Sequence, residues 1–99
     1  MNKEKTLLTI ITEAVLEDDV IKHLKDLGAH GYTVFDARGK GGQELLAGDR
    51  VEVPNIQIQV ICNADVADAV QSAFQDKYFE NYAMVIYRSV VEVIRSDKF

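Results

Sequence analysis

Residues 56–60, with the sequence IQIQV, alternate strictly between apolar and polar side chains. This period of two is typical of a β-strand that has one apolar and one polar face. Residues 51–53 show the same alternation before Pro54, which indicates a bulge or an edge at that point. A strand of this kind belongs in a sheet that is covered on one face. The rest of the chain has to supply both the other strands and the layer that covers this face.

Three other segments have the composition of strands. Residues 6–12 (TLLTIIT) are rich in β-branched side chains and apolar on both faces, so we predict a central, buried strand. Residues 31–38 predict a second strand. Residues 83–95 (AMVIYRSVVEVIR) predict a long final strand that is again apolar on both faces. The second half of this strand is longer than a domain of this size can cover, so we expect another molecule to bury its remaining apolar surface.

Two segments have the spacing of amphipathic helices. The acidic residues 17–19 suit the N-terminal turn of a helix that ends at Gly28. Asn63 or Asp65 can cap a second helix, which ends at Tyr78-Phe79. Each helix carries an apolar stripe directed at the sheet. The stripes consist of Val20, Ile21, Leu24 and Leu27 in the first helix and of Val66, Val70, Ala73 and Phe74 in the second.

This order of elements predicts an α+β, ferredoxin-like βαββαβ fold, in which a four-stranded antiparallel sheet carries both helices on one face. The length of 99 residues, 47% of them hydrophobic, fits a single domain over residues 1–99. The other sheet face would expose a large apolar patch on a monomer, so we predict an oligomer that packs through its sheets. The second and third strands form a hairpin, whose long glycine-rich connection covers about residues 39–54.

Charge and composition exclude several classes of function. A net charge of −5 without a basic stripe argues against nucleic-acid binding. The chain has no apolar run approaching the roughly 18 residues of a membrane-spanning helix, and no signal-peptide pattern follows the charged start, so we expect a cytoplasmic protein. Cys62 is the only cysteine, which rules out an intrachain disulfide and predicts a small buried side chain at a strand end.

Glycine and basic residues gather where the long connection begins. Gly39, Gly41 and Gly42 can adopt backbone angles closed to other residues, so their N–H groups can turn toward an anion, and Arg38 and Lys40 add positive charge. This pattern indicates a site for an anion such as phosphate or carbonate. The alternative is a flexible hairpin tip with a solvated lysine, which most short clusters of this kind form.

Several motifs, in the order in which they occur, resemble those of the PII-like signalling proteins over nearly the whole chain. They are Thr12-Glu13, Gly28-Ala29-His30-Gly31-Tyr32-Thr33-Val34, Gly39-Lys40-Gly41, Asn55-Ile56, Tyr78-Phe79-Glu80-Asn81-Tyr82-Ala83 and Ile86-Tyr87. The resemblance is closest to the PII-like proteins associated with bicarbonate transporters and carboxysomes. It implies a non-enzymatic regulator, a homotrimer with adenine nucleotides in the clefts between subunits, and a loop that docks on a partner. The implied partner is a membrane bicarbonate transporter or a carboxysome-related protein.

The resemblance also implies which residues bind the nucleotide. Thr33 would lie near the adenine, and Gly39, Lys40, Gly41 and Gly42 would surround the phosphates. Classical PII proteins place a lysine near the phosphates in the segment that corresponds to Glu80-Asn81-Tyr82-Ala83 in this chain. Arg95 or Arg88 of a neighbouring subunit would replace this lysine. The loss of the lysine favours ADP or AMP over ATP, either alone or together with bicarbonate.

Other departures from the pattern of the classical PII proteins argue against two of their kinds of regulation. No tyrosine occurs in residues 42–53, where classical PII proteins carry a modifiable one, which argues against uridylylation. Asn55 stands where classical PII proteins have a lysine, which argues against 2-oxoglutarate sensing. Glu13, at the end of the first strand, can face either the cleft or the solvent, and the sequence does not distinguish these two alternatives. Tyr78, Phe79, Tyr82 and Tyr87 are expected to pack at the end of the sheet and at the subunit interface.

Other functions are compatible with the same fold. A divalent-metal-binding trimer similar to the cation-tolerance proteins is the main alternative, but the chain offers only His23, His30 and Cys62 as nitrogen and sulfur ligands, so we predict no metal site. A small enzyme similar to acylphosphatases would need an arginine and an asparagine at a spacing that this sequence does not repeat. A dimeric regulator that binds amino acids also remains open.

Overall fold

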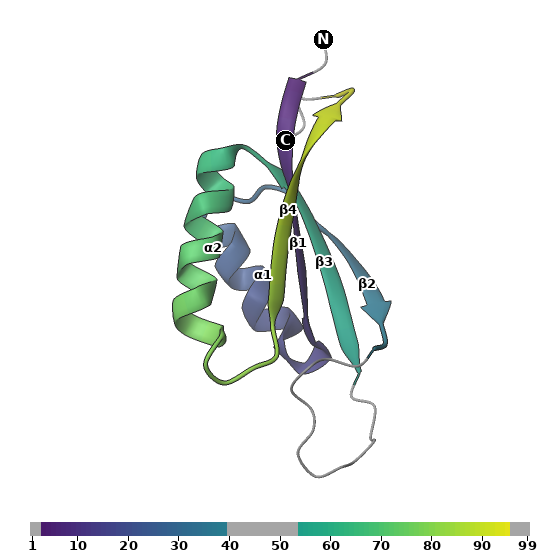
Figure 1. The fold of residues 1–99 in the computed structure, drawn as a ribbon, viewed down its shortest axis with the longest axis vertical. Coiled ribbons are helices and arrows are strands. Elements are labelled where there is room, and N and C mark those ends of the chain that lie inside the picture. Colours follow the sequence, from purple (N-terminus) through teal and green to yellow (C-terminus); the bar gives the residue numbers. More distant parts are fainter. Residues whose placement is uncertain (1–2, 40–53, 96–99) are drawn as a thin grey trace.

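The computed structural model describes residues 3–39 and 54–95. Along the chain follow β1 (Lys3–Glu13), the 3-10 turn η1 (Ala14–Leu16), α1 (Glu17–Asp26), β2 (Thr33–Ala37), β3 (Asn55–Cys62), α2 (Ala64–Tyr78) and β4 (Val85–Val93). The strands form one sheet in the order β2-β3-β1-β4, and each neighbouring pair is antiparallel. Both helices lie on the same face of this sheet (Figure 1). The predicted ferredoxin-like topology is confirmed.

The ends of some elements differ from the predicted ones. β1 begins at Lys3 rather than at residue 6, because Lys3 still pairs with Val93 of β4. β2 is shorter than the predicted 31–38, since its pairing with β3 runs only from Thr33 to Ala37. The pairing of β4 with β1 begins at Val85, so residues 83 and 84 are not part of the strand. The predicted alternation at residues 51–53 lies outside the described residues.

The helices begin and end close to the predicted positions. α1 begins at Glu17 with its acidic first turn, and Gly28 follows its C-terminal end with a φ of +101°, a conformation that favours glycine. Asn63 occupies the N-cap position of α2, but its side chain caps no backbone N–H. Its Oδ1 atom instead accepts a hydrogen bond from Lys5 Nζ at 2.8 Å.

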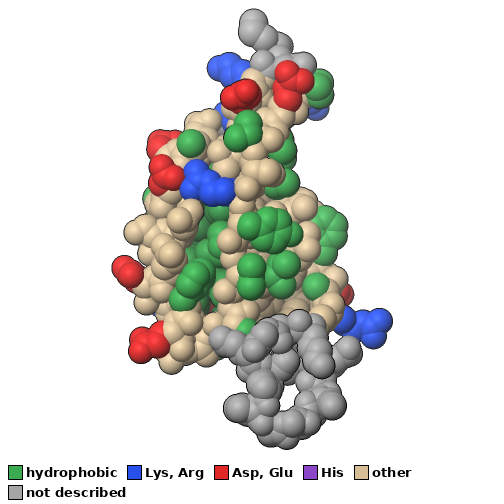
Figure 2. Space-filling model, viewed as in Figure 1, with side chains coloured by type: hydrophobic (Ala, Val, Ile, Leu, Met, Phe, Trp, Pro, Cys, Tyr) green, Lys and Arg blue, Asp and Glu red, His purple; other side chains and the backbone are tan. Residues whose placement is uncertain are grey.

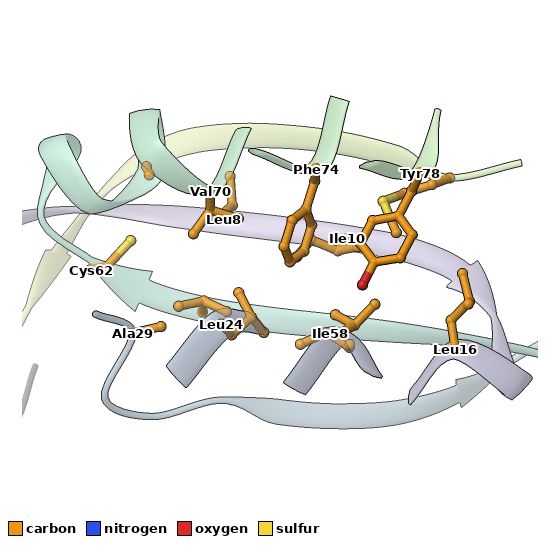
Figure 3. Close-up of a cluster of buried hydrophobic side chains, with 14 of the residues drawn as sticks. Leu8, Ile10, Leu16, Leu24, Ala29, Ile58, Cys62, Val70, Phe74 and Tyr78 are labelled. Atoms are coloured by element: carbon orange, nitrogen blue, oxygen red, sulfur yellow. The ribbon is translucent and has the colours of Figure 1, made fainter. Parts of the chain in front are cut away.

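The hydrophobic core fills the space between the helices and the sheet (Figure 3). Every second side chain of β3 is buried, as the alternation at residues 56–60 predicts. The central members of the core, all less than 1% exposed, are Leu8, Ile10, Val20, Leu24, Ile58, Val60, Ala67, Val70 and Phe74. Cys62 is 5% exposed at the end of β3, so the prediction of a small buried side chain is confirmed.

Tyr78 links the two helices at one end of the core. Its ring is 2% exposed, and its hydroxyl donates a hydrogen bond of 2.6 Å to Asp19 Oδ2 on α1. This hydrogen bond is the main reason that the pKa of Asp19 is lowered. Burial, and then the same hydrogen bond, raise the pKa of Tyr78. The acidic first turn of α1 therefore has a packing role in addition to its place at the helix start.

The sheet face without helices, here called the open face, is partly apolar. Val85 and Tyr87 of β4 point to it and are each 52% exposed, and Phe35 of β2 is 45% exposed on the same side. Figure 2 shows hydrophobic side chains gathered over β4 in the middle of the molecule. On the helix side, Val90 lies farther along β4 and is 69% exposed. β4 therefore carries apolar side chains on both faces, as the sequence predicts.

Candidate functional site at the loop end of the sheet

Three strands of the sheet end or begin in one row, next to the long connection. β1 ends at Glu13, which pairs with Asn55 at the start of β3, and Asn55 pairs with Ala37 at the end of β2. Gly39 follows two residues later. We call this row, together with Gly39 and Ala83, the loop end of the sheet. Figure 1 shows β2 and β1 ending at the same side of the molecule.

Glu13 organises the backbone at the loop end. Its Oε1 atom accepts a hydrogen bond from the Thr12 hydroxyl at 2.9 Å, and its Oε2 atom accepts one from the Ala83 N–H at 3.3 Å. The Ala14 N–H donates to the Pro54 carbonyl at 2.9 Å. These contacts join the end of β1 to the segment before β4 and to the segment before β3. The sequence left the role of Glu13 open, because its partner Ala83 lies 70 positions away.

The predicted binding residues fall into three groups. Gly39 is exposed at the loop end, and within the described residues no heavy atom outside its chain neighbours lies within 4 Å of the place where a Cβ atom would stand. Lys40, Gly41 and Gly42 lie outside the described residues. Thr33 is exposed at the opposite end of β2, where it pairs with Gln59. Four residues of strand, about 13 Å, separate Thr33 from Ala37, and Gly39 follows two residues later.

Arg95 lies far from the loop end of its own chain. It follows Val93, which pairs with Lys3 at the start of β1, while the loop end lies at Glu13. Ten residues of strand separate these rows, about 33 Å. A single chain therefore does not bring Arg95 together with Gly39. Arg88, the other arginine considered, is held on the helix side by Asp68 Oδ1 at 2.9 Å and Gln71 Oε1 at 3.0 Å.

Aromatic side chains border the loop end. After α2 the chain passes through Phe79, which is 41% exposed, and Tyr82, which is 36% exposed. The ring of Tyr82 lies edge-on to the buried ring of Tyr78, with 6.1 Å between the centroids. Tyr78 thus packs at the end of the sheet, as predicted, while Phe79, Tyr82 and Tyr87 keep part of their surface open. Their predicted place in a subunit interface stays a prediction.

The remaining candidate ligands are dispersed. His30 is exposed in the turn before β2, and His23 Nδ1 lies 2.9 Å from the Asp19 carbonyl oxygen of its own helix. In the part of the chain that the structure describes, no three histidine, cysteine or carboxylate side chains are grouped so that they could hold a metal ion. Among the same residues, no helix is both long enough and apolar enough to cross a bilayer.

Comparisons with known proteins agree with this architecture. The family model of nitrogen regulatory protein P-II matches residues 5–98. A PII-like signalling protein from Thermus thermophilus is 33% identical, with 99% of this chain and 97% of the other covered and a TM-score of 0.84. The structure of CPII from Thiomonas intermedia bound to ADP and bicarbonate is 24% identical, with 100% and 97% covered and a TM-score of 0.85.

An apo form of CPII is 20% identical to this chain, with 94% of this chain and 95% of the other covered and a TM-score of 0.75. At these identities, the two CPII structures show a shared fold. The family model covers almost the whole chain, and the Thermus protein adds a relative of substantial identity over the same span. The chain described here belongs to the nitrogen regulatory protein P-II family and is a PII-like signalling protein.

Proposed function

We propose that this protein is a non-enzymatic regulator that binds an adenine nucleotide, ADP or AMP in preference to ATP, in clefts between the subunits of a homotrimer. Bicarbonate binds together with the nucleotide. The observation that carries the proposal is that the whole chain superimposes on CPII, whose structure contains ADP and bicarbonate. Further CPII structures contain ADP with AMP and bicarbonate, or ADP with AMP and acetate.

The positions of the predicted binding residues support a site between subunits. Thr33 begins β2, Gly39 follows two residues after the other end of this strand, and Arg95 lies beyond the far end of β4. A nucleotide that contacts all three must therefore use residues of two chains. In the proposed site, Gly39, Lys40, Gly41 and Gly42 surround the phosphates, and Arg95 comes from the neighbouring subunit.

The open face of the sheet supports the assembly. A monomer would expose Val85 and Tyr87, two positions apart on β4, on a face that no helix covers. Packing three copies through this face removes apolar surface from water, which stabilises the assembly by about 25 cal/mol for each Å² buried. Cyclic closure also leaves every copy in the same environment.

The proposed regulation acts through the connection between β2 and β3. A nucleotide that binds one state of this segment more tightly than another shifts the protein toward that state. The loop then docks on a membrane bicarbonate transporter or a carboxysome-related protein in the cytoplasm, so that the protein controls the use of inorganic carbon.

Calorimetric titration tests the proposal. ADP, AMP, ATP and cyclic AMP are titrated into the purified protein with and without bicarbonate, and light scattering after gel filtration reports the mass of the assembly. We expect heat with ADP and AMP and the mass of a trimer. Lys40→Ala should weaken ADP binding by about 1.5–3 kcal/mol because it removes a charge-assisted contact to a phosphate. Lys25→Ala, on the exposed side of α1, is the matched control. No heat with any nucleotide contradicts the proposal.

A further inference from the structure

A row of hydrogen-bonding side chains crosses the open face of the sheet. Gln59 of β3 pairs with Thr33 of β2 on one side and with Thr9 of β1 on the other. Thr9 in turn pairs with Tyr87 of β4. Residues that pair directly across two strands lie on the same face of a sheet, about 5 Å apart. These four residues, here called the polar row, therefore form a continuous line from one edge of the sheet to the other.

The rows on either side of the polar row are more apolar. The row toward the loop end consists of Phe35, Gln57, Ile11 and Val85, and the row on the other side contains Ile61, Leu7 and Ser89. Each of these neighbouring rows holds a single polar side chain. Successive rows are two residues apart along each strand, which corresponds to about 7 Å. The polar row is therefore a distinct band on a largely apolar face.

The centre of the open face carries no charge on the described strands, although charged residues make up 27% of the chain. The charged side chains of this face are Lys3, Lys5 and Glu13, at the two ends of β1. Between these ends, Val85 and Tyr87 each expose 52% of their surface. A depletion of charge at the centre of a surface is the compositional signature of a protein–protein interface. The open face thus has the composition of a surface that a second copy of this chain covers, as the proposed assembly requires.

The polar row has unused hydrogen-bonding capacity. Among the described residues, no hydrogen bond reaches the side-chain amide of Gln59 or the hydroxyl of Tyr87. Water hydrates these groups on a single chain. When a second copy covers the face, most of this water leaves, and a polar group buried without a hydrogen bond is costly. The copy that covers the face must therefore present donors and acceptors opposite the polar row.

We propose that the polar row fixes the alignment of the packed copies and that Gln59 is its main determinant. This inference rests on the homotrimer of the proposed function. In a ring whose axis runs along the strands, every row stays at one height, so the polar rows of the three copies face one another. A slip by one row, about 7 Å, places the Gln59 amide against the more apolar row of the neighbouring copy. Apolar side chains attract in either alignment, whereas the amide is satisfied in only one, as a buried asparagine defines the register of a coiled coil.

Gln59→Leu tests the role of the amide. The substitution removes the donor and the acceptor at nearly constant volume and keeps the face apolar, so the copies should still associate, but in more than one alignment. A slipped alignment does not close into a ring. Light scattering after gel filtration should therefore show assemblies larger than the trimer beside it. Gln75→Leu, the same substitution at an exposed position of α2, should give the trimer alone.

Distances between spin labels report the alignment directly. A nitroxide label is attached to Lys25→Cys, on the exposed side of α1, in a protein that also carries Cys62→Ala. A closed ring of three copies in one alignment gives a single label-to-label distance in pulsed electron paramagnetic resonance. We expect this single distance for the otherwise unchanged chain and for Gln75→Leu, and several distances for Gln59→Leu.

Gln59→Glu tests whether the polar row lies between the copies. The substitution keeps the size of the side chain and adds a negative charge to each copy at the same height. The protein concentration at which half of the chains are trimeric should rise by about tenfold or more, because like charges are brought together and desolvated. Gln75→Glu makes the same change in net charge on the helix side and should leave this concentration unchanged.

Two results overturn the inference and leave the proposed trimer intact. The first is a Gln59→Leu protein that forms only trimers with one label distance. The second is a Gln59→Glu protein whose trimer is as stable as that of the wild type. Circular dichroism verifies that each variant is folded before the assemblies are compared. A wild-type chain that stays monomeric removes the proposed trimer together with the inference, so the two failures are distinguishable.

Discussion

Replacing Tyr78 by phenylalanine tests the contact that joins the two helices. The substitution keeps the buried ring and removes only the hydroxyl that donates to Asp19 Oδ2 at 2.6 Å. A hydrogen bond to a charged group contributes about 1.5–3 kcal/mol when it is protected from water. Asp19 is exposed, however, and water can solvate its carboxylate after the hydroxyl is gone. We therefore expect Tyr78→Phe to lower the free energy of unfolding by about 1–1.5 kcal/mol.

The dependence on pH follows from the two pKa shifts. The hydrogen bond from Tyr78 holds the pKa of Asp19 below its ordinary value of 3.8. A lowered pKa in the folded state stabilises the fold where the carboxylate is ionised, so this stabilisation is present above about pH 4 and is lost as the pH falls through the lowered pKa. The difference in stability between the wild type and Tyr78→Phe should therefore shrink in acid.

Alkaline pH should reduce the same difference for another reason. Burial and the bond to Asp19 raise the pKa of Tyr78 above its ordinary value of 10.0. Above pH 10, the tyrosine therefore ionises in the unfolded chain before it ionises in the folded one, and the wild type loses stability as the pH rises. Tyr78→Phe has no hydroxyl to ionise and escapes this loss.

A double-mutant cycle with Asp19→Asn measures the contact itself. Thermal and urea unfolding are followed by circular dichroism at one protein concentration, because association makes the melting temperature depend on concentration. We expect a coupling energy of about 1 kcal/mol at pH 7. Tyr82→Phe is the control, since its hydroxyl forms no hydrogen bond with another described residue. A coupling below about 0.3 kcal/mol, or a difference that does not change with pH, refutes the reasoning.

Three further substitutions or reagents test other features. Gly28→Ala should destabilise the fold by about 1–2 kcal/mol, because the φ of +101° is unfavourable for a side chain, whereas Gly31→Ala meets open space and should have little effect in the same melts. Cys62 should react with a thiol reagent only as fast as the protein unfolds, because burial raises the pKa of the thiol and covers the sulfur; fast labelling of the native protein would contradict this. Tyr87→Asp should dissociate the proposed trimer into monomers in light scattering, while Tyr87→Phe should not.

The fold could be predicted from local patterns because burial in this chain follows them. The alternation of residues 56–60 matches the alternating burial of β3, and the helical spacing of Val20 and Leu24 places both side chains in the core. Each of these patterns depends on residues that are neighbours on one face of a strand or helix. Such patterns determine which side of each element is buried. Four strands and two helices can be connected in only a few topologies that bury all of these sides.

The long-range contacts of Tyr78 and Glu13 could not be predicted in the same way. Asp19 and Tyr78 lie 59 positions apart, and Glu13 and Ala83 lie 70 positions apart. The acidic residues 17–19 already had a sufficient local explanation as a helix start, and a glutamate at the end of a strand can equally face water. No local signal distinguishes these interpretations. The partner of each side chain becomes known only when the folded chain brings these distant segments together.

The distances along the strands make assembly a condition for the proposed nucleotide site. β2 holds Thr33 and Ala37 about 13 Å apart, with Gly39 two residues beyond Ala37. The antiparallel register of β1 and β4 puts Val93, two residues before Arg95, about 33 Å from the row of Glu13. The backbone hydrogen bonds of the sheet fix the positions of Thr33, Ala37 and Val93, so side-chain movement does not bring Thr33, Gly39 and Arg95 of one chain to the same nucleotide. A monomer produced by Tyr87→Asp should therefore lose ADP binding even though Tyr87 points away from the helix layer and the variant keeps its helical circular dichroism. A folded monomer that binds ADP as tightly as the wild type would show that one chain forms the site, and Arg95 would then have no part in it.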